Sequence, residues 1–164
     1  MIIISNTSPL TNLAAIGQFD LLGHLYPGLI IAEGVWDELN AGGRYWPGRN
    51  EVAASDWIER RQVQNQPLVR ALQRDLDQGE SETIALAVEL GAGLVLLDEK
   101  EGRNAAVHFG LRPVGIVGVL LEAKKKGLTA ELRPHLDALR NEAGFYLSER
   151  LYHHALALAG EVVS

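Results

Sequence analysis

Short runs of branched apolar residues alternate along the chain with longer stretches in which apolar residues recur at helical spacing. The first run, at residues 2–4, consists of three isoleucines and stops abruptly at small polar residues. Continuous apolar runs of this length are typical of strands that are covered on both faces. They predict strands at residues 2–4, 29–31, 94–97 and 113–116. Helical spacing predicts helices at residues 9–16, 19–25, 33–39, 67–76, 80–90, 100–109, 117–126, 130–142 and 148–159.

The alternation of strands and helices predicts an α/β fold. Its natural form is a short parallel sheet with right-handed crossovers, flanked by helices in three α/β/α layers. Residues 41–48 are rich in glycine and aromatic side chains and predict a loop. Residues 56–63 suit either a short helix or an edge strand. With 164 residues and no internal repeat, residues 1–164 are expected to form one domain.

Helix-start signals flank two of the predicted helices. Thr7 or Ser8 can cap the helix that follows the first strand, and Pro9 suits its first turn. Thr129 is expected to cap the helix predicted at 130–142. The first strand should therefore end at Asn6, and the carboxyl ends of strands are where open α/β sheets bind ligands.

Composition narrows the possible functions. The formal net charge is −6, which argues against broad, non-specific binding of duplex nucleic acid. A local basic rim around an acidic, metal-loaded site remains compatible with that charge. The chain has no cysteine, which excludes disulfides, thiolate nucleophiles and cysteine zinc sites and fits a cytoplasmic location. No apolar run approaches the roughly 20 residues that span a bilayer, and no basic region precedes the isoleucines as in a secretory signal, so no membrane partner is expected.

Acidic and amide side chains are predicted to converge near the carboxyl ends of the strands. Asn6 and Asp98 each follow a strand, and Glu38 lies on the helix after the second strand. Glu80 and Glu82 begin the helix that leads into the Asp98 strand. Neighbouring strands lie about 5 Å apart, so these side chains can share an ion. Hard cations such as magnesium prefer oxygen ligands, and a bound ion can activate water and clamp a phosphodiester.

Each of these acids also has a purely structural interpretation. Asp98 can be a helix N-cap, which is common for an acid after a strand. Glu80 and Glu82 lie in a first helical turn, where the helix dipole stabilises negative charge. Glu38 can be a solvated helix residue. Spacing alone does not decide between these roles and metal binding.

Aromatic residues and one serine are weaker candidates. Tyr45 and Trp46, in the predicted loop, are open to stacking on bases, whereas Trp36 is more typical of a core residue. Ser8 near an acid suggests a nucleophile, but no histidine and acid accompany it in sequence, so helix capping is the better interpretation.

Several short motifs, in this order, resemble a PIN domain. They are Ser-Asn-Thr-Ser-Pro-Leu at 5–10, Val-Trp-Asp-Glu-Leu at 35–39, Gly-Glu-Ser-Glu-Thr-Ile-Ala-Leu-Ala at 79–87 and Leu-Leu-Asp-Glu at 96–99. With Gly-Arg at 102–103 and the stretch at 115–127, the chain resembles the PilT N-terminus-type subfamily, close to VapC-like toxins. The resemblance covers nearly the whole chain.

This resemblance implies a ribonuclease that depends on Mg²⁺ or Mn²⁺. It also implies RNA as substrate, a small antitoxin as a possible partner, and a homodimer or higher homo-oligomer. The resemblance places the family's first acid at Asn6, the second at Glu38, the third at Glu82 or Glu80, and the fourth at Asp98. It also suggests supporting residues, which are Ser8, Arg103 and either Glu99 or Glu101.

The chain departs from the family pattern at two positions. Asn6 stands where an aspartate is usual, and Leu96 stands where many relatives have a threonine. An amide oxygen can bind magnesium but brings no charge. Two hypotheses follow: an active endoribonuclease toxin masked by an antitoxin, or a catalytically weak binding or oligomerisation module.

Overall fold

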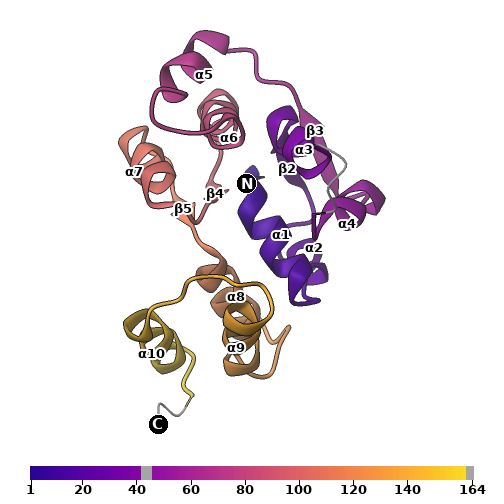
Figure 1. Ribbon diagram of the computed structural model, residues 1–164, viewed down its shortest axis with the longest axis vertical. Coiled ribbons are helices and arrows are strands. Elements are labelled where there is room, and N and C mark those ends of the chain that lie inside the picture. The colour runs from indigo at the N-terminus through magenta and orange to yellow at the C-terminus, as the bar shows by residue number, and fades with distance from the viewer. Residues whose placement is uncertain (42–45, 162–164) are drawn as a thin grey trace.

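In the computed structural model, which describes residues 1–41 and 46–161, the described strands form one five-stranded sheet. Neighbouring strands are parallel, in the order β3-β2-β1-β4-β5. The strands are β1 (Ile3–Ser5), β2 (Leu29–Ala32), β3 (Ile58–Arg61), β4 (Leu94–Leu96) and β5 (Pro113–Val114). Helices cover both faces of the sheet (Figure 1), so the predicted three-layer α/β/α fold is confirmed.

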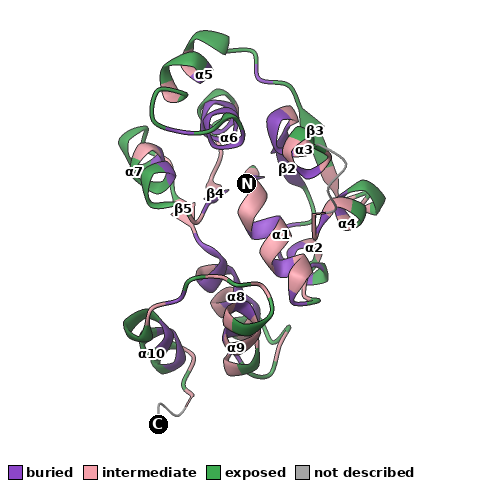
Figure 2. Ribbon diagram, in the orientation of Figure 1, coloured by how far each residue is buried: buried purple, intermediate pink, exposed green. Residues whose placement is uncertain are grey.

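The central strands send side chains alternately into two hydrophobic cores. In β2, Leu29 and Ile31 join the core on one face, and Ile30 joins the core on the other. In β4, Leu96 and Val95 divide in the same way. Residues two apart on a strand face the same side, and here both sides are covered by helices. This double burial explains why the strands appear in the sequence as continuous apolar runs, and Figure 2 shows the sheet flanked by helices that turn buried faces toward it.

The helices divide between the two faces of the sheet. One core includes side chains from α1 (Thr7–Ala15), α2 (Asp20–Leu25), α3 (Glu33–Leu39), α8 (Ile116–Lys125), α9 (Arg133–Asn141) and α10 (Glu149–Leu158). The other core includes side chains from α5 (Gln66–Leu72), α6 (Gln78–Leu90) and α7 (Lys100–His108). The short helix α4 (Arg49–Ala54) packs beside α1. None of the helices in the described chain has the length and apolar character needed to cross a bilayer.

The structure resolves one ambiguous segment and moves several element boundaries; α5, for example, ends at Leu72 instead of residue 76. The ambiguous segment at 56–63 forms the edge strand β3, of which only Ile58 is partly buried. Ile116 begins α8 rather than ending the preceding strand. The helix predicted from residue 130 begins at Arg133, and Thr129 does not cap it. The helix α4 was not expected, because Val52 is its only buried residue and gives no helical apolar pattern.

The start of α1 corrects the predicted cap. Asn6, rather than Thr7 or Ser8, is the N-cap residue, and its side chain makes no capping hydrogen bond. The Thr7 hydroxyl instead donates to Glu38 Oε2 at 2.5 Å. The Thr7 side chain, which the sequence predicted to cap α1, therefore connects the first turn of α1 to α3 instead.

The sheet has a topological switch point between β1 and β4. The chain passes from β1 outward to β2 and β3, whereas β4 lies on the other side of β1 and is followed by β5. Open α/β sheets have a crevice outside the carboxyl ends of the strands at such a point. Asn6 lies there, and its backbone N–H donates to Leu96 O of β4 at 2.9 Å.

Candidate active site

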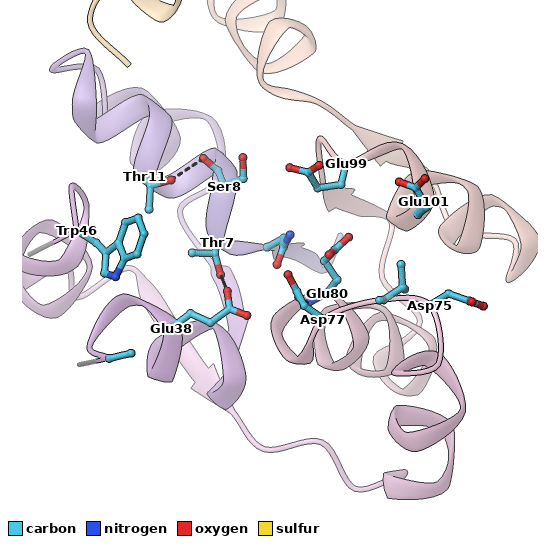
Figure 3. A pocket seen from close by; sticks show the side chains of 13 residues that line it. Thr7, Ser8, Thr11, Glu38, Trp46, Asp75, Asp77, Glu80, Glu99 and Glu101 are labelled. Atoms are coloured by element: carbon cyan, nitrogen blue, oxygen red, sulfur yellow. Dashed lines mark hydrogen bonds between the residues drawn. The ribbon is translucent and has the colours of Figure 1, made fainter. Parts of the chain in front are cut away.

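A cavity of about 630 Å³ lies at the carboxyl ends of β1 and β4. Its lining residues come from α1, α3, the first turns of α6 and α7, and two connecting segments. They are Asn6, Thr7, Ser8, Thr11, Glu38, Ala41, Trp46, Asp75, Leu76, Asp77, Glu80, Glu99 and Glu101. Trp46 and Thr11 lie on one side of the cavity, and Glu99, Glu101 and Asp75 lie on the other (Figure 3).

Asn6 brings a buried, unpaired oxygen to this cavity. The residue is only 4% exposed. Within the described residues, its Oδ1 atom is buried and has no hydrogen-bond partner. A buried acceptor without a donor is costly, and such atoms in native proteins usually signal a ligand, an ion or a water.

Glu38 is held at the cavity by two neighbouring elements. Its Oε1 accepts a hydrogen bond from Gly79 N at 2.9 Å, and its Oε2 accepts from the Thr7 hydroxyl. Burial raises the pKa of Glu38, and the hydrogen bond from Thr7 partly opposes that increase. The carboxylate is thus fixed between α1 and α6 while one side of it lines the cavity.

Glu80 faces Asp77 across the first turn of α6 (Figure 3). Asp77 is the N-cap residue of this helix, and its Oδ1 accepts from Glu80 N at 2.8 Å. Burial, followed by the negative charge of Asp77, raises the pKa of Glu80 to about 7. The high pKa shows that the folded chain does not neutralise the charge of this carboxylate well.

The lining of the cavity is strongly acidic. Its acids are Glu38, Asp75, Asp77, Glu80, Glu99 and Glu101. None of the described lining residues is a lysine, arginine or histidine. Like charges gathered around one cavity repel one another, so the arrangement favours a bound cation.

Glu82 lies outside this cavity. It is two residues beyond Glu80 on α6, and a helix turns about 200° over two residues, so the two side chains leave the helix on opposite sides. Glu82 Oε1 accepts from Gly34 N at 3.1 Å, and its Oε2 accepts from the Gln78 side chain. Both carboxylate oxygens are therefore occupied by contacts within α3 and α6.

Asp98 also lies outside this cavity, beside a second one of about 420 Å³ that it lines together with Arg103. Its Oδ1 accepts from Ile116 N, the first residue of α8, at 2.8 Å. Its Oδ2 is buried and has no hydrogen-bond partner in the described chain. Burial raises the pKa of Asp98 to about 6, although the Ile116 N–H and the charge of Arg103 both oppose this.

A family model described as a PIN domain matches residues 2–161. The chain belongs to the PIN domain family. PIN domains are generally nucleases, and these nucleases generally use divalent metal ions. Family membership thus gives the chain a nuclease-type function and a nucleic acid as its class of substrate. No curated protein and no solved structure matches the chain.

The structure brings together only some of the positions that the PIN resemblance indicates. Asn6, Glu38 and Glu80 line the acidic cavity, and so do Ser8 and Glu99. Glu82, Asp98 and Arg103 do not line it. The Ser8 Oγ accepts a hydrogen bond from the Asn12 side chain at 3.1 Å. Tyr45, a candidate for base stacking, lies outside the described residues, whereas Trp46 lines the cavity.

The cavity of this PIN domain fits a divalent cation with hard oxygen ligands. No group of three His, Asp or Glu side chains in residues 1–41 and 46–161 could hold a metal ion by itself. Asn6, whose Oδ1 is unpaired, and the carboxylates of Glu38 and Glu80 line the same cavity. No lysine, arginine or histidine among the described residues forms an ion pair with Glu38 or Glu80. Mg²⁺ often keeps several waters, so two carboxylates and one amide oxygen suit it.

Sequence reasoning missed Asp77 and the glycines that contact the acids. The spacing of Asp77, three residues before Glu80, is that of a capping residue and could have indicated its position. Each of four acids is packed so closely against a glycine that a Cβ atom there would collide with the carboxylate. A Cβ on Gly34 would lie 2.7 Å from Glu82 Oε2, one on Gly79 2.7 Å from Glu38 Cδ, one on Gly102 2.8 Å from Glu80 Oε2, and one on Gly115 2.8 Å from Asp98 Oδ1.

Proposed function

We propose that this PIN domain is a metal-dependent endoribonuclease that hydrolyses RNA phosphodiesters with Mg²⁺ or Mn²⁺. The observation that carries the proposal is the unpaired, buried oxygen of Asn6 in an acidic cavity with Glu38 and Glu80. A divalent cation bound there supplies Lewis-acid activation of water and of the phosphodiester. The cavity volume of about 630 Å³ lies in the range of sites that bind nucleotide-sized ligands.

In this proposal some residues of the cavity bind the ion and others contact the substrate. Asn6, Glu38 and Glu80 hold the cation, and the hydrogen bonds from Thr7 and Gly79 keep Glu38 turned toward it. Ser8 and Glu99 line the cavity beyond these ligands, where they contact the substrate or its hydration water. Trp46, which lines the cavity on the opposite side from Glu99 (Figure 3), is the candidate for contact with a base.

Cleavage of a structured RNA by the purified protein tests the proposal. Cleavage should require Mg²⁺ or Mn²⁺, stop with EDTA and fall at least a hundredfold in Glu80→Gln. Glu142→Gln is the matched control, because Glu142 is exposed and lines neither cavity. Cleavage that persists in EDTA, or that survives Glu80→Gln undiminished, contradicts the proposal.

We also propose a finer assignment, in line with the resemblance to VapC-like PilT N-terminus proteins. Residues 1–164 form a single PIN domain that acts in the cytoplasm as the toxin of a toxin–antitoxin pair. It assembles as a homodimer or higher homo-oligomer. Co-expression with the product of a neighbouring small gene tests the toxin role, because an antitoxin should restore growth and co-purify with the chain.

A catalytically weak binding or oligomerisation module is the second candidate function. The observation that favours it is the neutral side chain of Asn6, which brings no charge where the family pattern has an aspartate. Metal titration separates the two candidates: a module that has lost its metal site should show no saturable Mn²⁺ binding in the millimolar range.

A further inference from the structure

Helices α3 and α6 are joined by two reciprocal hydrogen bonds, in which a glutamate of each helix accepts from a backbone N–H in the first turn of the other. Glu38 of α3 accepts from Gly79 N at 2.9 Å, and Glu82 of α6 accepts from Gly34 N at 3.1 Å. Each glycine is the second residue of its helix, where the backbone N–H has no intrahelical acceptor. Each helix thus supplies the carboxylate that satisfies the other helix. We call these four residues the α3–α6 brace.

The contacts of Glu82 are those of a brace rather than of a metal ligand. α3 follows β2 directly, and its N-cap residue, Ala32, has no side chain that could cap it. Glu82 fills this need with Oε1, while its Oε2 is engaged by the Gln78 side chain. The carboxylate is also seated against Gly34, where any larger residue would displace it. Negative charge at this helix N-terminus is favourable in itself.

We infer that Glu82 is a positioning residue for the metal site. By holding α3 on α6, it keeps Glu38 beside Glu80, the neighbour of Gly79 in the first turn of α6. The inference rests on the proposed function, because it assigns Glu82 a role in arranging the two carboxylates of that site. It separates the roles of Glu80 and Glu82, which sequence spacing leaves interchangeable.

The test compares Glu82→Gln with Glu89→Gln in Mn²⁺ binding and steady-state RNA cleavage, at a temperature where circular dichroism shows all variants folded. Glu89 is a matched control on the same helix, because its carboxylate also accepts backbone hydrogen bonds, but from Gln64 and Asn65 rather than from α3. Glu82→Gln should lower kcat about tenfold, weaken Mn²⁺ binding because Glu38 is less well held, and leave KM within twofold. Glu89→Gln should leave all three unchanged.

A second comparison asks whether Glu82 acts through Glu38. Adding Glu82→Gln to Glu38→Gln should lower kcat by less than twofold further. A loss of Mn²⁺ affinity in Glu82→Gln that adds in full to the loss in Glu38→Gln would make Glu82 an independent ligand and overturn the inference. An unchanged kcat in Glu82→Gln would overturn it as well.

The brace is tested apart from activity by thermal unfolding. Gly34→Ala should lower Tm less in a Glu82→Ala background than in the wild type, because removal of the carboxylate makes room for the new methyl group. Equal shifts in the two backgrounds would show that the brace does not exist. Absence of metal-dependent cleavage in the wild type, with the coupling present, would instead count against the proposed function.

Discussion

Asn6 brings an oxygen atom but no charge to the point where β1 and β4 end. An aspartate of the same shape would add an attraction for a divalent cation that the amide lacks. We therefore expect Asn6→Asp to tighten Mn²⁺ binding about tenfold, or roughly 1.4 kcal/mol, and to raise the rate of RNA cleavage.

Calorimetric titration with Mn²⁺ measures this effect, with Asn141→Asp as the control that adds the same charge at an exposed position of α9. Equal affinities of wild type and Asn6→Asp would show that the Asn6 side chain does not contact the ion.

Glu80 should make the metal-free protein less stable as the pH rises. Its pKa is about 7 in the folded chain and 4.5 ordinarily, so the unfolded chain loses this proton first. Between pH 4.5 and 7 the free energy of unfolding should therefore fall, by about 1 kcal/mol once water in the cavity screens the charge.

Urea denaturation in EDTA at pH 5 and pH 7.5 measures the change. Glu80→Gln should make the free energy of unfolding less dependent on pH. In the wild type, added Mn²⁺ should bring the stability at pH 7.5 back to its value at pH 5. The same slope in both proteins would assign the pH dependence to other groups.

At the level of residues, the sequence located part of the cavity. Asn6, Glu38 and Glu80 could be predicted to lie near one another, because Asn6 follows a strand and the two glutamates lie on helices that connect strands of a parallel sheet. The sequence could not separate Glu80 from Glu82, because the side of α6 that faces the cavity depends on how that helix packs on α3. It also missed the bond from Thr7 to Glu38, which joins residues 31 apart.

Among the elements, β4 and α8 are connected by a hydrogen bond to Asp98, which lies just after β4. Its Oδ1 accepts from Ile116 N, so Asp98→Ala should lower the free energy of unfolding by about 1 kcal/mol. Asp98→Asn keeps an acceptor oxygen and should cost less. Because Asp98 lies outside the acidic cavity, both variants should bind Mn²⁺ within twofold of the wild type.

Chemical denaturation and Mn²⁺ titration of the two variants provide the measurement. The ligand role that the resemblance indicates for Asp98 stays a prediction, and a tenfold loss of affinity in both variants would support it.

The order of strands and helices was predictable where burial on both sides leaves continuous apolar runs, as in β2 and β4. β3 was ambiguous because it is an edge strand whose residues after Ile58 are exposed. α4 had no signal, since one buried valine makes no periodic pattern. The start of α9 was misplaced because Thr129 resembles a cap, although its hydroxyl lies 2.7 Å from His135 Nε2.

For the whole molecule, Glu161 links the C-terminal helices α8, α9 and α10, which lie at the end of the molecule opposite α5 and α6 (Figure 1). It accepts from the Leu132 and Arg133 N–H groups at the start of α9, and from Lys124 Nζ of α8 at 2.7 Å. Glu161 itself lies three residues after Leu158, the last residue of α10. Glu161→Gln should therefore lower the free energy of unfolding by about 2 kcal/mol without changing RNA cleavage at low temperature.

Guanidinium denaturation and a cleavage assay check this separation of stability from activity. Glu131→Gln, an exposed acid nearby in sequence, is the control. Loss of cleavage in folded Glu161→Gln would show that the α8–α10 end of the molecule also shapes the acidic cavity.

The overall α/β/α architecture was predictable because local periodicity and the parallel crossover rule act together. The contacts of Glu161 were not, because no local pattern links it to residues 28 to 37 positions earlier. The same limit applies to the acidic cavity, which is assembled from segments separated by up to 95 residues between Asn6 and Glu101.

The close contacts between glycines and acids tie the evolution of distant positions together. While Glu80 is present, Gly102 cannot be replaced by a residue with a side chain unless the carboxylate moves. Asp98 restricts Gly115 in the same way. A lineage that loses one of these acids releases its glycine to vary. In aligned relatives, a larger residue at one of these glycine positions should therefore occur together with loss of the acid that contacts it. Such a substitution would mark a relative in which that carboxylate is no longer needed.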